Sequence, residues 1–180
     1  MAWTTLTKRA IGYLITKGND VDIWIDDMNF LHTRPRGLWV PPTVVSGAGT
    51  SIAAFSYYPS AELVDAVLAL AYMAFSVPAD FTTLVKASIV VIPGGTGDLR
   101  RSVLTTYGAN GQVYTTHTGV ITVGVVAVVI NQLFEIDITS TLASLAAGDY
   151  VGVEMARSSV DAADTVNATV HCLGLWIEYY

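Results

Sequence analysis

The stretch Gly119–Ile130, which reads GVITVGVVAVVI, decides the fold class. Nine of its twelve residues are β-branched, and such side chains favour strands because they pack well on a pleated surface. A membrane-spanning helix needs about 20 apolar residues, so this run is too short to cross a bilayer. Val64–Val77 contains Asp65 and is also too short. Both runs predict buried strands, and no membrane span is expected.

Strand-forming segments continue on both sides of this run. Leu99–Tyr107 and Gln112–His117 flank Asn110-Gly111, a dipeptide typical of hairpin turns. The chain holds 23 Val, 20 Thr and 12 Ile residues, nearly a third of its length. About eight strands with short turns predict an all-β, jelly-roll-like antiparallel β-sandwich. The other expected strands are Lys86–Ile92, Gln132–Ile138, Asp149–Ala156 and Thr165–Tyr179.

One short helix is expected at Thr139–Ala147. Thr139 or Ser140 would cap its start, and Gly148 would close it in a left-handed conformation. The closing segment Thr165–Tyr179 alternates, but neither of its faces is purely polar. This pattern indicates either a β-bulge near Cys172 that switches the inward side, or a strand covered on both faces.

Composition narrows the function classes. Of the 180 residues, 52% are hydrophobic and 13% are charged, with a net charge of −6, whereas soluble domains average about 25% charged residues. A disordered chain has the opposite balance. A nucleic-acid-binding protein needs clustered basic residues, and the nine here are scattered. The apolar excess predicts surface that is covered by neighbouring copies.

The first part of the chain differs from the rest. Residues 1–45 lack a sustained apolar period, and Trp39-Val40-Pro41-Pro42 reads as an extended stretch fixed by proline. We therefore expect residues 1–45 to form an extended arm that docks on another protein. Residues 46–180 are expected to form the β-sandwich domain.

No catalytic or metal-binding pattern is found in the sequence. His32, His117 and His171 are far apart, and the single cysteine, Cys172, lies in an expected core strand. An acidic cluster offers oxygen ligands but lacks the spacing of a calcium loop, so solvated carboxylates are expected there. The sequence predicts no enzymatic activity, no cofactor and no metal. The cluster comprises Asp20, Asp22, Asp26 and Asp27.

Short motifs in the sandwich region carry a family resemblance. They are Val77–Phe81 (VPADF), Leu145–Val153 (LAAGDYVGV), and the segment from Arg157 to Thr165 that leads into Leu173–Tyr179. In this order they resemble the β-sandwich modules of tailed-bacteriophage structural proteins, found in head fibres, decoration proteins and tail or spike components. The resemblance spans roughly residues 60–180. It implies a homotrimeric virion protein without enzymatic activity.

Two sets of side chains are singled out. Arg157 has Asp161 or Asp164 as a partner that would pin the loop before the last strand. Four tyrosines near expected loops offer rings on which a sugar can stack. The leading hypothesis is a virion structural protein that self-associates and binds capsid or tail proteins through residues 1–45. The alternative is a carbohydrate- or receptor-binding module of a phage fibre or spike that contacts a host glycan through Tyr57, Tyr58, Tyr107 and Tyr114.

Overall fold

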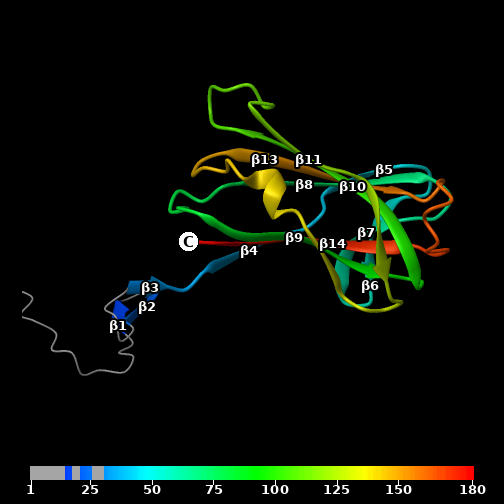
Figure 1. The fold of residues 1–180 in the computed structure, drawn as a ribbon, viewed down its shortest axis with the longest axis horizontal. Helices are drawn as coiled ribbons and strands as arrows, with labels where there is room; N and C mark the ends of the chain where they lie inside the picture. The colour runs from blue at the N-terminus through cyan, green and yellow to red at the C-terminus, as the bar shows by residue number, and fades with distance from the viewer. Residues whose placement is uncertain (1–14, 18–20, 26–30) are drawn as a thin grey trace, which may run out of the picture.

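The computed structural model describes residues 15–17, 21–25 and 31–180, with side chains described from Arg34 onward. Two antiparallel sheets pack face to face as a β-sandwich (Figure 1). The all-β sandwich predicted from the sequence is confirmed. Within the described residues no helix has the length and apolar character needed to cross a bilayer.

The five-stranded sheet has the order β11-β10-β13-β8-β5, and the six-stranded sheet has the order β12-β9-β14-β7-β6, with β4 also paired to β14. A separate three-stranded sheet has the order β1-β2-β3. The bounds are β1 Ile15–Lys17, β2 Val21–Ile25, β3 Leu31–Thr33, β4 Arg36–Val40, β5 Val44–Ser46, β6 Ser51–Phe55, β7 Tyr58–Leu63, β8 Leu68–Ser76, β9 Leu84–Pro93, β10 Gly97–Gly108, β11 His117–Val128, β12 Phe134–Asp137, β13 Tyr150–Ser158 and β14 Val170–Tyr179.

The core lies between the two sheets and follows the two-residue period of the strands. On β10, for example, Leu99 and Val103 are buried while Leu104 is exposed. Burying such a side chain contributes about 1.5–3 kcal/mol relative to leaving it in water. The fully buried large apolar side chains come from both sheets and include Leu63, Met73, Ile89, Leu99, Met155, Leu175 and Ile177.

A β-bulge in β14 shapes one edge of the six-stranded sheet. The register against β9 shifts between Cys172 and Gly174, so the inward positions change from Cys172 to Leu175 and Ile177. The bulge predicted near Cys172 is thus confirmed. A Cβ on Gly174 would lie 2.5 Å from the carbonyl oxygen of Val40. Only glycine therefore lets β4 approach β14 so closely.

The sandwich begins earlier in the chain than predicted. β4 pairs with β14, with Trp39 opposite Trp176, and β5 pairs with β8. The boundary expected between residues 45 and 46 is wrong, because β4 and β5 each belong to one of the two sheets. These strands, together with β6 and β7, also explain why the sandwich has more than the eight strands expected. Of the proposed arm, residues 1–14, 18–20 and 26–30 lie outside the described residues.

Two local predictions need correction. The expected helix is a single 3₁₀ turn, η1 (Thr139–Leu142), whose N-cap is Ile138 rather than a hydroxyl residue. Asp137, the residue before this N-cap, accepts the main-chain N–H of Thr139 through Oδ1 at 2.8 Å. Gly148 has the left-handed φ of +82° that was predicted. Around Asn110-Gly111 the chain forms a loop over residues 109–116 and not a two-residue hairpin, so Gln112–His117 is not a strand.

Candidate functional site

Arg157 locks the loop that precedes β14. Its guanidinium is fully buried and binds Asp164 through Nη2 at 2.9 Å and through Nε at 3.2 Å. It also donates to the carbonyl oxygens of Leu63, Ala168 and Val166. Of the two partners offered by the sequence, Asp164 is the one in contact. Asp161 instead pairs with Arg100, with Nε and Oδ2 3.2 Å apart.

The four candidate tyrosines lie in very different environments. Tyr57 and Tyr114 are 97% and 78% exposed. Tyr107 is buried on the inner face of β10, where its hydroxyl accepts the N–H of Ser144 at 3.2 Å and its ring stacks on His117. Tyr107 occupies one of the alternating positions of β10 whose side chains point into the core. Its ring therefore has no free face on which a sugar could stack. Tyr58 is half-exposed and lines a groove.

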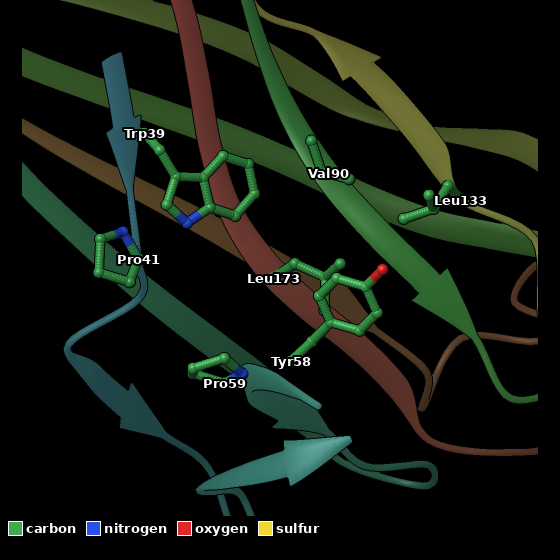
Figure 2. A pocket seen from close by; sticks show the side chains of 7 residues that line it. All are labelled: Trp39, Pro41, Tyr58, Pro59, Val90, Leu133 and Leu173. Carbon is green, nitrogen blue, oxygen red and sulfur yellow. The ribbon is translucent and has the colours of Figure 1, made fainter. Parts of the chain in front are cut away.

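The groove lies on the outer face of the six-stranded sheet and has a volume of about 380 Å³. Figure 2 shows the rings of Trp39 and Tyr58 lying along the sheet surface with Leu173 close by. Trp39 is 44% exposed and Tyr58 is 49% exposed, while Leu173 is buried. We call this feature the Trp39 groove; it is lined by Trp39, Pro41, Tyr58, Pro59, Val90, Leu133 and Leu173.

Charged side chains lie next to the Trp39 groove on neighbouring strands. Glu135 stands opposite Val90 in the register of β12 against β9. Its carboxylate binds the Lys86 amino group with 2.5 Å between Oε2 and Nζ, and this hydrogen bond raises the pKa of Lys86. Beside Trp39, the indole N–H of Trp176 donates to Glu178 at 2.9 Å. The groove thus combines an apolar lining with a polar surround.

A second surface lies along β11, at one end of the five-stranded sheet. Val120 stands opposite Leu104, and Val125 stands opposite Arg100. The next residues along β11, Ile121 and Val126, pack on the core, whereas Val120 and Val125 are exposed. Because β11 ends the strand order, its second edge has no partner among the described strands. We call this feature the β11 surface; its exposed apolar residues are Leu104, Val120, Val123 and Val125.

Sequence reasoning missed Trp39 and the β11 surface. Trp39 belongs to the segment expected to form an arm, because the run before Pro41 is short. The β11 surface has a signal in the sequence: no Asp, Glu, Lys or Arg occurs between Arg101 and Glu135. Such a long uncharged stretch in a strand-rich region is typical of a covered surface.

The remaining candidates show no reactive chemistry. Burial raises the pKa of the Cys172 thiol to about 12, so the thiol is unreactive at neutral pH. Within residues 34–180, no three His, Cys, Asp or Glu side chains form a group that could hold a metal ion. Asp20, Asp26 and Asp27 of the acidic cluster lie outside the described residues, and Asp22 is placed only as part of β2.

Comparison with known proteins gives a distant structural likeness. No family model and no curated protein matches the sequence. A solved structure of a Family 11 carbohydrate-binding module from Clostridium thermocellum, in complex with a β-1,3-1,4-mixed-linked tetrasaccharide, is similar with a TM-score of 0.41 and 10% identity. The match covers 94% of this chain and 96% of that chain. At these values the likeness says nothing about a ligand, so the functional argument rests on this chain's own residues.

Proposed function

We propose that this chain is a non-enzymatic structural protein of a virion that acts by assembling with copies of itself, most simply as a homotrimer. The observation that carries the proposal is the β11 surface, where Val120, Val123 and Val125 are exposed on a long edge strand. A free edge strand without charges or proline is an aggregation hazard that natural monomers avoid. A covering neighbour removes that hazard.

The β11 surface continues across the five-stranded sheet. Leu104 lies between Val120 and Glu154, and Glu154 in turn lies between Leu104 and Tyr72. Val44 completes the row at the far edge. Glu154 is the one charged residue in this row. Burial raises the pKa of Tyr72, and the charge of Glu154 and the hydrogen bond that the Tyr72 hydroxyl donates to it add to this effect. A second copy seated on this face would therefore bury mainly apolar atoms.

The virion assignment is supported by the roles of the residues in the phage-like motifs. Gly148 closes a turn with a left-handed φ, and Asp149 accepts the N–H of Ala146 at 2.9 Å just before β13. Arg157 and Asp164 lock the final loop. Each of these residues serves folding rather than chemistry, as a structural subunit requires. Docking to capsid or tail proteins is proposed for the part of residues 1–45 that precedes β4.

Light scattering on the purified chain tests the assembly. We expect the wild-type protein to have a mass above one protomer at micromolar concentration. Val125→Glu and Val120→Lys place charges on the β11 surface and should shift the population toward monomers, because moving a charged side chain from water into an apolar interface is unfavourable even where it meets an opposite charge. Glutamate at position 125 faces Arg100 on β10, so this variant is expected to fold.

The matched control is Tyr57→Glu, at an exposed position in the turn between β6 and β7 of the six-stranded sheet. It adds the same charge away from the β11 surface and should leave the assembly intact. A monomeric wild type, or equal dissociation by Tyr57→Glu and Val125→Glu, would overturn the proposed interface. Mass spectrometry of purified particles tests the virion assignment, and a chain missing from those particles would refute it.

A second candidate function, recognition of a host glycan, is favoured by the Trp39 groove. Its two half-exposed rings lie on the six-stranded sheet, whereas the β11 surface belongs to the other sheet. One assembled subunit can therefore carry both activities.

A further inference from the structure

We propose that the Trp39 groove binds one pyranose residue of a glycan, with the rings of Trp39 and Tyr58 as the stacking platform. This inference rests on the second candidate function and assigns it a site. The groove has about 380 Å³, which lies at the lower end of the range for small-molecule sites. It thus fits a short ligand segment and not a long polymer strand enclosed on all sides.

The platform is rigid because each ring is fixed by its strand. Trp39 is part of β4, which pairs directly with β14. This close pairing is possible because Gly174 has no side chain. Tyr58 begins β7 and pairs with Phe55 on β6, and Pro41 and Pro59 restrict the chain beside the two rings. A site that exists before the ligand arrives loses little conformational entropy on binding.

The chemistry of the lining selects a sugar. A pyranose with mostly equatorial hydroxyls has a flat face of C–H bonds, and this face is complementary to the electron-rich face of an aromatic ring. The sugar's hydroxyl groups point outward around the ring edge. In the lining, the indole N–H of Trp39 and the hydroxyl of Tyr58 are the polar side-chain groups that can meet them.

Charged side chains beside the groove can bind the sugar hydroxyls that Trp39 and Tyr58 do not reach. Glu135 neighbours Val90 across the strand pair, and its ion pair with Lys86 is half-exposed. Carboxylates accept and ammonium groups donate hydrogen bonds to hydroxyls, directly or through water. An aliphatic ligand would leave this charged side of the groove unused. We therefore assign the groove to a pyranose residue of the glucose or galactose type.

A glycan array probed with the full-length chain tests the inference, followed by calorimetric titration with the best-binding oligosaccharide. We expect binding to array glycans that end in glucose or galactose. Trp39→Ala and Tyr58→Ala should each weaken it by about tenfold or more, since a lost aromatic contact of this kind corresponds to roughly that factor. Trp39→Phe and Tyr58→Phe should retain most of the affinity because they keep a ring.

Tyr57→Ala and Tyr114→Ala are the matched controls, because both remove an exposed tyrosine outside the groove lining and should leave binding unchanged. No binding anywhere on the array overturns both the site and the glycan function. Binding that survives Trp39→Ala and Tyr58→Ala but is lost with Tyr57→Ala or Tyr114→Ala overturns this site and leaves the function standing. If Trp39→Ala does not fold, Tyr58→Ala alone decides between these results.

Discussion

Removing the carboxylate of Asp164 should destabilise the sandwich far more than removing that of Asp161, three residues earlier. Asp164 has a side chain that is 1% exposed and binds the fully buried guanidinium of Arg157. It also accepts the main-chain N–H groups of Arg100 and Val166. Asp161 is 42% exposed and pairs with a partly exposed Arg100.

The expected loss of stability depends on which contacts of Arg157 remain in the variant. Breaking a buried ion pair from one side costs about 3–5 kcal/mol because the other charge is left buried and unpaired. In Asp164→Ala, Arg157 keeps its three main-chain carbonyl partners and a longer contact of 3.5 Å from Nη2 to Oδ1 of Asp65, so we expect the lower value, about 3 kcal/mol. At about 2–4 °C per kcal/mol for a chain of this size, the melting temperature falls by about 6–12 °C. Asp161→Ala removes an exposed pair and should cost about 0–1 kcal/mol.

Urea unfolding followed by circular dichroism measures both variants, at one fixed protomer concentration because assembly also stabilises the fold. An unchanged dependence on urea shows that the two unfolding reactions are comparable. Asp164→Asn keeps an acceptor oxygen without the charge and should fall between wild type and Asp164→Ala. A loss for Asp161→Ala as large as that for Asp164→Ala would refute the assignment of Arg157 as the loop's anchor.

Three further outcomes follow from single contacts. With its pKa near 12, about one Cys172 thiol in 10,000 is ionised at pH 8, so a thiol reagent should label it only after unfolding; rapid labelling of the native protein would contradict its burial. Burial lowers the pKa of His171, while the charge of Glu62 opposes this shift. The unfolded chain therefore binds more protons than the folded one. The free energy of unfolding should fall as the pH drops below about 6.5, the pKa of an unperturbed histidine, toward the lower pKa of His171 in the folded protein. Replacing this histidine by glutamine should flatten that part of the pH profile, and identical profiles would exclude the effect. A side chain at Gly119 would overlap the main chain of Thr141, so Gly119→Ala should lower stability by about 1–3 kcal/mol, and an unchanged melting temperature would show that η1 does not pack there.

The local features were predictable from the sequence because they depend on neighbours in the chain. The bulge near Cys172 follows from a strand whose alternation changes face, and the left-handed Gly148 follows from a glycine in the turn that precedes β13. The phage-like motifs likewise pointed to Arg157 and its acidic partners. The choice of Asp164 over Asp161 required the fold, because it depends on where the loop crosses β10 and β13.

The surfaces depend on pairings between distant segments, which periodicity does not reveal. Both Tyr58 and Tyr107 lie near expected loops in the sequence. In the structure Tyr107 points into the core from β10, whereas Tyr58 at the start of β7 is half-exposed. Trp39 reaches the groove only because β4 joins the last strand of the chain. The uncharged run of the β11 surface can be read from the sequence, but its position at an edge that no described strand covers depends on the fold.

Hydrogen–deuterium exchange along β11 tests the central claim, that this strand is covered in an assembly of identical chains. In an isolated protomer one edge of His117–Val128 has no strand partner among those described, so the amides on that side would exchange rapidly. At the concentrations where the chain assembles, we predict slow exchange along the whole strand and faster exchange in Val125→Glu. Rapid exchange of the edge amides in the wild-type protein, equal to that of the variant, would contradict the account.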